Sequence, residues 1–498
     1  MANYRDPSVG NGHERDEAAI SVDTAATTNG GIDGGTAQQR NRERRIREIL
    51  LAATDVFRDE GYAGFTARKV AAKAGLSLSN LQYYFPAREE LLSAIINDFL
   101  QDAFARCREI VERGGISAQR RCALLIETIF AAGVDASAKK FLFEIWAFAQ
   151  HDPSVSGLLT RVLLGYRDLF ATLLSEMNPA LEQEQCRARA WALTVQAEGM
   201  MILVARGQDS LRDREEFVRT ARRGLKVVAG LTEACAHLPE GGEIGISPMA
   251  DRSALDAEGG MFESGGLIRH SRYEQTVRQG AIVPSYLRPT MQNRRREQKI
   301  NEIVEAAAAV LTSEGYGNFT LARVAREAGI LTSGLQYYFP AHEDLLSATI
   351  NALFSHYYDR WSRMGRPSDK PPLERLFEII EEVFVEACDP RVCRFSFEMF
   401  ALAEHSAFTA NLLRSTYEAY RQIYVDLVHE IDPSASGREC LARATLIAAQ
   451  LEGLLLHTYS TGWQTPGLGR LLVLFKTLAR EISSGFPGNG RAAELMAL

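Results

Sequence analysis

The sequence predicts an all-α protein made of two tandem copies of one helical unit. Residues 61–97 and 315–351 are identical at 23 of 37 positions when the first segment is shifted by 254. The same shift, without a gap, aligns Pro179 with Pro433. Apolar residues recur at the spacing of amphipathic helices, and no convincing alternation predicts a strand. Whatever one copy does as half of a dimer, this chain could therefore do alone.

Composition indicates an ordinary water-soluble protein. The chain has 498 residues, of which 46% are hydrophobic and 24% charged. It has no apolar run of 18 residues and no secretory signal, so we expect a cytoplasmic protein without a membrane partner. Seven scattered cysteines without a C-x-x-C pair predict reduced thiols, and we expect neither a metal site nor a cofactor. Because the net charge is −7, any nucleic-acid binding requires a local basic surface.

The pattern of helices divides the chain into seven segments. A glycine- and proline-rich connector with eight glycines in 57 residues separates the copies. As a random coil it would span about 40 Å, which lets the copies meet side by side; a short helix over 249–263 stays open. We expect a disordered tail (1–40), a small helical domain (41–97), a larger helical domain (98–235), a flexible linker (236–292), a second small domain (293–351), a second larger domain (352–486) and a tail (487–498).

Each copy begins with an amphipathic helix that ends at a glycine. In copy 1 the apolar side chains recur at i, i+3, i+4, i+7 and i+11. Gly61 and Gly315 stand where a helix commonly has a C-terminal glycine. The positions are Ile46, Ile49, Leu50, Ala53 and Phe57, and in copy 2 Ile300, Ile303, Val304, Ala307 and Leu311.

A helix-turn-helix follows in each copy. Thr66 is a good N-cap for a short helix that a glycine turn closes, and a second short helix spans roughly Leu78 to Tyr84 before Pro86. Copy 2 repeats the design from Thr320. In this motif the second helix enters the major groove, where its N-terminal side chains reach base edges.

The run F-T-x-x-x-V-A-x-x-A-G-L-S-x-x-N-L-Q-Y-Y-F-P-x-x-E-x-L-L resembles the DNA-binding domain of the TetR (tetracycline-repressor) family. The resemblance covers residues 43–97 and 297–351, and extends weakly over the helices that follow. It implies a helical homodimer that regulates transcription, usually as a repressor. Such a dimer binds a palindromic operator and is released when a small molecule occupies its C-terminal domain.

The resemblance also implies which residues contact DNA. Asn80 could pair bidentately with adenine, whereas Gly334 offers no side chain. Leu331 replaces Ser77 and removes a capping hydroxyl. The family more often has Tyr at Gln82 and Gln336, and Lys at Arg88 and His342. The implied positions are Thr66, Arg68, Leu78, Ser79, Asn80, Gln82, Tyr84 and Arg88 in copy 1, and Thr320, Ala322, Thr332, Ser333, Gly334, Gln336, Tyr338 and His342 in copy 2.

The small domains of the two copies, which the resemblance implies are the DNA-binding domains, differ in net charge. Residues 40–92 contain ten Arg/Lys and seven Asp/Glu, a net charge of +3, whereas residues 294–346 contain six and seven, a net charge of −1. Because phosphate contacts supply most of the affinity for DNA, we expect copy 1 to contribute more binding free energy. Arginines before the first helix of each copy, among them Arg44, Arg45 and Arg295, either reach DNA or mark a solvated helix start.

The larger domain of each copy, which the resemblance implies is the regulatory domain, contains a repeated pair of polar residues. Glu144 and His151 are seven apart, two turns along one helix face, and Glu398 and His405 repeat them. We favour a structural or pocket-lining pair over a metal site, since two ligands do not make one. Nearby aromatic residues such as Trp146 are more typical of a core than of a ligand site, but the resemblance keeps an apolar effector pocket plausible.

Residues near the end of each copy are candidates for pairing the copies. Glu198-Gly199 and Glu452-Gly453 lie in long apolar helices, and in the family such helices form the dimer's four-helix bundle. A flexible tether gives the partner an effective concentration near millimolar, so intramolecular pairing should outcompete association between chains. A homo-oligomer stays possible.

These observations predict a DNA-binding regulator that acts as a single-chain pseudo-dimer on an operator with unlike half-sites, and that a small molecule releases. One alternative is that copy 2 is a degenerate partner or sensor and two chains supply the working DNA-binding domains. Another is a non-catalytic scaffold. An enzyme is disfavoured because the sequence has no nucleophile elbow, phosphate loop or H-E-x-x-H motif.

Overall fold

The computed structural model describes residues 37–206, 210–231, 291–461 and 467–486, and those residues contain helices but no strand. The predicted all-α class is therefore confirmed. Among the described residues, 37–47 form one unit and those from Glu48 onward form the other. Within the described residues no helix is long and apolar enough to cross a membrane. The predicted tails, and the linker with its possible helix at 249–263, lie outside the described residues except at their edges.

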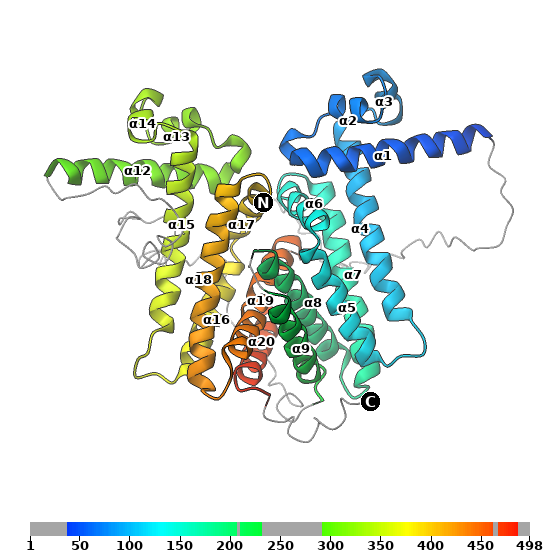
Figure 1. Ribbon diagram of the computed structural model, residues 1–498, viewed down its shortest axis with the longest axis vertical. Coiled ribbons are helices and arrows are strands. Elements are labelled where there is room, and N and C mark those ends of the chain that lie inside the picture. Colours follow the sequence, from blue (N-terminus) through cyan, green and yellow to red (C-terminus); the bar gives the residue numbers. More distant parts are fainter. Residues whose placement is uncertain (1–36, 207–209, 232–290, 462–466, 487–498) are drawn as a thin grey trace, which may run out of the picture. The chain divides into compact units, whose positions relative to one another are not determined.

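Both copies follow one order of helices (Figure 1). The first helix begins at Ala37 and its counterpart at Met291. Copy 1 contains α1 (Ala37–Gly64), α2 (Ala67–Lys73), α3 (Leu78–Tyr84), α4 (Arg88–Glu112), α5 (Ala118–Val134), α6 (Ala136–Ala149), α7 (Pro153–Met177), α8 (Gln183–Arg206) and α9 (Leu211–Val228). Copy 2 contains α12 (Met291–Glu314), η3 (Tyr316–Asn318), α13 (Leu321–Glu327), α14 (Thr332–Tyr338), α15 (His342–Gly365), α16 (Pro372–Ala387), α17 (Pro390–Ala403), α18 (Ala407–Ile431), α19 (Gly437–Thr461) and α20 (Leu468–Ser483).

A small aromatic core fixes the three-helix DNA-binding domain on the regulatory domain in copy 1. Phe57 of α1 is fully buried, and its ring lies 5.9 Å from that of Phe65, which precedes α2. The other neighbour of Phe57 is Phe141 of α6, with ring centroids 4.9 Å apart. Aromatic pairs at these separations add to the free energy of apolar burial. The DNA-binding domain therefore shares its core with α6.

Helices α8 and α9 of copy 1 pack with α19 and α20 of copy 2 (Figure 1). The tightest point lies where α8 crosses α19. A Cβ atom added at Gly199 would lie 1.8 Å from the Ala449 carbonyl oxygen, and one added at Gly453 would lie 1.8 Å from that of Val195. Only glycine allows this approach, so the two backbones touch at Gly199 and Gly453.

Two buried carboxylates beside these glycines have different partners. Glu198 Oε2 lies 3.3 Å from Nε2 of His457, which belongs to copy 2. Glu452, its counterpart, instead accepts a 2.8 Å hydrogen bond from the hydroxyl of Tyr417 in its own copy. The residue at the position of His457 in copy 1 is Leu203, which cannot pair with a carboxylate. The contact between the copies is therefore asymmetric although the backbones are repeats.

Glu452 makes the stability of the fold depend on pH. Burial raises its pKa from 4.5 to about 7, against the opposing effect of the tyrosine hydroxyls. Because the folded chain holds this proton more tightly than the unfolded chain, stability is greatest below the unfolded pKa of 4.5 and falls as pH rises through about 7. At about 1.36 kcal/mol per pKa unit, the loss is on the order of 3 kcal/mol.

Urea denaturation at pH 5 and pH 8 checks this expectation. The free energy of unfolding of the wild type should fall between the two values by more than that of Glu452→Gln, which cannot titrate. Equal pH dependence in both proteins would contradict it.

Candidate nucleic-acid interface

The recognition helix of copy 1 has a capped start and one buried anchor. Ser77 precedes α3 and its hydroxyl accepts a 3.2 Å hydrogen bond from the Asn80 backbone N–H. Leu81 is buried and fixes the helix against the domain. Ser79, Asn80 and Gln82 are exposed, whereas Leu78 and Tyr84 are half-buried. Hydrogen-bonding side chains that can read base edges therefore lie on the outward face of α3.

The recognition helix of copy 2 has the same length but a weaker start. Leu331 precedes α14, is 79% exposed and makes no side-chain cap, which confirms the predicted loss of the capping hydroxyl. Thr332, Ser333 and Gln336 are exposed, and Tyr338 is half-buried. A Cβ atom at Gly334 would meet nothing within 4 Å, so at the position of Asn80 this helix has open space and no hydrogen-bonding group.

One exposed aromatic residue per recognition helix was missed from the sequence. Tyr83 is 75% exposed and Tyr337 is 70% exposed, whereas the predicted contacts Tyr84 and Tyr338 are half-buried. In each helix the two rings meet edge-on, with centroids 5.2 and 5.1 Å apart. With Leu81 as the buried anchor, helical geometry places residue 83 about 200° around the helix, on the far side. That spacing could have identified Tyr83.

The helix before α3 adds basic side chains to copy 1. Thr66 is exposed and its hydroxyl accepts a 3.3 Å hydrogen bond from the Lys69 backbone N–H, so it serves as the predicted N-cap of α2. Arg68 and Lys73 are exposed on that short helix. Copy 2 has Ala322 and Glu327 at these two positions. Copy 1 therefore presents two cations where copy 2 presents none.

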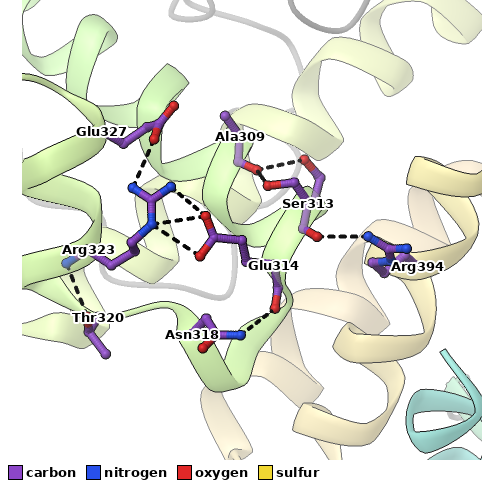
Figure 2. Close-up of polar contacts among 9 residues, drawn as sticks. Ala309, Ser313, Glu314, Asn318, Thr320, Arg323, Glu327 and Arg394 are labelled. Atoms are coloured by element: carbon purple, nitrogen blue, oxygen red, sulfur yellow. Dashed lines mark hydrogen bonds and ion pairs between the residues drawn. The ribbon is translucent and has the colours of Figure 1, made fainter. Parts of the chain in front are cut away.

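In copy 2 carboxylates neutralise an arginine of this helix (Figure 2). Arg323 Nε donates to both oxygens of Glu314, at 2.9 and 3.1 Å, and Nη1 donates to Glu327 at 2.9 Å. Thr320, which is exposed, accepts the Arg323 backbone N–H at 3.1 Å. The corresponding Lys69 of copy 1 has one such partner, Glu60 at 2.7 Å. The difference in formal charge is thus also a difference in how the cations are paired.

Two residues that were predicted to contact DNA form hydrogen bonds with backbone carbonyls of their own domain. Arg88 donates from Nε to the Phe65 carbonyl at 2.9 Å and from Nη2 to the Tyr62 carbonyl at 2.7 Å. Its counterpart His342 places Nε2 2.7 Å from the Phe319 carbonyl oxygen. Arg88 and His342 therefore each join the start of α4 or α15 to the loop that precedes α2 or α13.

The arginines that precede the core of each first helix lie at the surface. Arg44 and Arg295 are exposed and Arg45 is half-buried. They occupy α1 and α12 respectively, the helices that lead into each helix-turn-helix.

The repeated Glu and His residues join the two copies beside the turn that follows the first helix of each DNA-binding domain. His405 of copy 2 places Nε2 2.7 Å from Glu144 Oε1, while Glu144 Oε2 accepts the Tyr62 backbone N–H at 2.6 Å. The reciprocal pair joins His151 Nε2 to Glu398 Oε1 at 2.7 Å. Glu398 Oε2 likewise accepts the Tyr316 backbone N–H at 3.4 Å. Each glutamate therefore bonds both to the turn of its own DNA-binding domain and to a histidine of the other copy.

The glycine that precedes this turn is required by both backbone and space. Gly61 has a φ of 67°, and a Cβ atom there would lie 2.7 Å from His405 Nε2. Gly315, at the equivalent turn, has a φ of 78°, and a Cβ atom there would lie 2.7 Å from Glu398 Oε1. Such φ values favour glycine. The glycines predicted at the ends of the first helices therefore lie directly beside the Glu–His pairs that join the copies.

Glu144, His151, Glu398 and His405 form pairs between the copies, which favours the structural alternative for these residues over the pocket-lining one. Trp146 does line a cavity of about 430 Å³ enclosed by α4 to α8, and so does Glu198. The ring centroid of Trp146 also lies 5.9 Å from that of Phe397 in copy 2.

Two helix-turn-helix domains with outward polar recognition helices define a DNA-binding regulator. A family model described as bacterial regulatory proteins, tetR family, matches residues 49–95 and 303–349, and one described as BetI-type transcriptional repressor, C-terminal, matches residues 372–480. The chain belongs to the TetR family of bacterial regulators.

Curated relatives resemble one copy of the chain in length. An uncharacterized HTH-type transcriptional regulator in the dhlA 5' region of Xanthobacter autotrophicus is 31% identical over 33% of this chain and 78% of its own length. BetI of Cronobacter sakazakii is 31% identical over 32% and 79%, and PksA of Bacillus subtilis is 28% identical over 32% and 82%. Both are named as HTH-type transcriptional regulators.

Proposed function

We propose that this chain is a cytoplasmic transcriptional repressor that binds one operator as a single-chain pseudo-dimer and is released by a small-molecule effector. The observation that carries the proposal is the set of reciprocal contacts between copies, above all the pairs His405–Glu144 and His151–Glu398 at 2.7 Å. In a homodimeric relative such symmetric contacts would join two chains. Here one chain supplies both sides.

The proposed repressor activity rests on similarity. The family model matched by residues 372–480 is described as a transcriptional repressor domain, and BetI is among the relatives. A repressor needs only to occupy its operator, so two DNA-binding domains and their pairing surface suffice, without an activating surface.

The two copies support unlike half-sites. Asn80 can pair bidentately with an adenine edge, and Gly334 has no group that could. The proposed DNA contacts are Arg44, Arg45, Thr66, Arg68, Leu78, Ser79, Asn80, Gln82, Tyr83 and Tyr84 in copy 1, and Arg295, Thr320, Thr332, Ser333, Gln336, Tyr337 and Tyr338 in copy 2.

A second candidate function has copy 2 as a partner that barely contacts DNA. The ion pairs of Arg323 with Glu314 and Glu327 favour it, since they remove a cation from that surface. In that case two chains would supply the two working domains, and the operator would contain two copies of the half-site that copy 1 reads.

Selection of bound fragments from random duplex DNA, at a fixed salt concentration, tests the proposal. We expect an imperfect palindrome whose halves differ in sequence. Asn80→Ala should lose preference at about one base pair of one half, a loss of roughly 1–3 kcal/mol. Gly334→Ala is the matched control and should leave both halves unchanged, because the added methyl meets nothing within 4 Å. Two identical half-sites that weaken together would contradict the pseudo-dimer and favour the second candidate.

A further inference from the structure

The contact of α8 with α19 is reciprocal, so its two surfaces could pair in more than one way. Gly199 meets the Ala449 backbone and Gly453 meets the Val195 backbone, and the shift of 254 residues turns each contact into the other. A reciprocal contact of this kind also joins identical subunits. Copy 1 could therefore pair with copy 2 of its own chain, or each copy could pair with the same copy of a second chain.

One position on these helices carries opposite charges in the two copies. It is Glu184 in α8 and Arg438 in α19. Arg438 Nε donates to Asp213 Oδ1 of copy 1 at 3.1 Å, and Glu184 forms an ion pair with Arg470 of copy 2. Each pair therefore joins α8 or α19 to the last described helix of the other copy, α20 or α9.

Pairing of identical copies would bring like charges together at this position. If copy 1 paired with copy 1 of a second chain, Glu184 would take the place of Arg438 and face Asp213. If copy 2 paired with copy 2, Arg438 would take the place of Glu184 and face Arg470. Each repulsion would occur twice, because the contact is reciprocal. Like charges placed opposite each other across an interface oppose association with the wrong partner.

A buried position on the same helices favours the same pairing. Glu198 is 3% exposed, and its Oε2 lies 3.3 Å from Nε2 of His457, where copy 1 has Leu203. If copy 1 paired with copy 1, each Glu198 would face a leucine, and a buried carboxylate that loses its ionic partner is costly. Glu452 needs no such partner, because it accepts the Tyr417 hydroxyl of its own copy. This cost therefore falls on the pairing of two copies 1.

We propose that Glu184, Arg438 and the Glu198–His457 pair make the pairing selective, so that copy 1 fits copy 2 and neither copy fits a second copy of itself. This inference rests on the proposed single-chain pseudo-dimer and names the residues that enforce it. Two separate chains are favoured over an exchanged complex, in which two chains pair copy 1 with copy 1 and copy 2 with copy 2.

Exchange of the two charges tests the selectivity in the full chain. Glu184→Arg/Arg438→Glu keeps the net charge, and both residues are exposed, so the fold should be retained. Both contacts within one chain then join like charges, whereas both pairings in the exchanged complex join opposite charges. The chains are refolded from urea at micromolar concentration and low salt, and sedimentation velocity then counts chains per complex.

The wild type should sediment as single chains. In the charge-exchange variant the dissociation constant of the two-chain complex should fall by about a hundredfold or more, and added salt should reduce that difference. The exchange Leu203→His/His457→Leu tests the buried position independently and should also favour two chains, because it gives Glu198 a histidine only when copy 1 pairs with copy 1.

His151→Ala/His405→Ala is the matched control. It removes two contacts that are repeats of each other and would recur in every pairing, so the chain should stay single. Two results would overturn the selectivity: single chains in both exchange variants with helical content retained, or equal association in the control. A single-chain wild type in those experiments would leave the proposed pseudo-dimer standing, whereas a wild type that already sediments as two chains would refute the pseudo-dimer as well.

Discussion

Gly199→Ala is expected to destabilise the chain by about 3 kcal/mol or more, although it adds one methyl group. The new Cβ would lie 1.8 Å from the Ala449 carbonyl oxygen and 2.7 Å from the Gly453 nitrogen, both backbone atoms that cannot rotate away. Helices α8 and α19 would have to separate. Overpacking commonly costs about 1–3 kcal/mol, and here a whole helix crossing would lose contacts as well. Because domains are stable by only about 5–15 kcal/mol, pairing of the copies should fail first.

Gly157→Ala is the matched control. Gly157 lies in α7, where an added Cβ would approach only Arg161 Nη1, at an ordinary 3.9 Å. The same substitution there should be neutral or stabilise by up to about 1 kcal/mol, since alanine favours helices. Urea denaturation of both variants gives the comparison. Equal free energies of unfolding would mean that the crossing at Gly199 does not hold the copies together.

Making copy 1 resemble copy 2 at two surface positions should weaken operator binding by about tenfold to a hundredfold near physiological salt. The double variant Arg68→Ala/Lys73→Glu imports the residues of Ala322 and Glu327. Both replaced side chains are exposed cations on α2, so the fold should be unaffected. Loss of two phosphate contacts should also lower the salt dependence of binding by about 2 in the slope of log K against log salt.

The reverse exchange, Ala322→Arg/Glu327→Lys, serves as its control and should strengthen binding. It removes the Arg323–Glu327 ion pair, but an exposed pair contributes only about 0–1 kcal/mol to stability. Unchanged binding in both exchanges would contradict the charge asymmetry argued above.

Local signals in the sequence were sufficient for the DNA-binding domains. The caps Thr66 and Ser77 and the anchor Leu81 act within one turn of chain, so the start of α2 and the approximate span of α3 could be predicted. The seven-residue spacing of Glu144 and His151 predicted a shared helix face, but α6 ends at Ala149 and His151 lies in the turn that follows it. Their partners lie 261 and 247 residues away, and no local pattern encodes such a contact.

Contacts within the DNA-binding domain are equally hard to predict. Arg88 is a cation near a recognition helix, and only the structure shows that it donates to the Phe65 and Tyr62 carbonyls. Whether a helix packs around a cavity or fills it depends on side-chain volumes from several helices at once.

The stoichiometry of the operator complex tests the central claim most directly. Sedimentation velocity of the full chain at nanomolar concentration, with and without the selected duplex, counts chains per DNA. One chain per duplex, from a free chain that is itself monomeric, is the predicted result, because Gly199, Gly453 and the two Glu–His pairs already join the copies. A complex of two chains on each duplex, formed cooperatively, would contradict it.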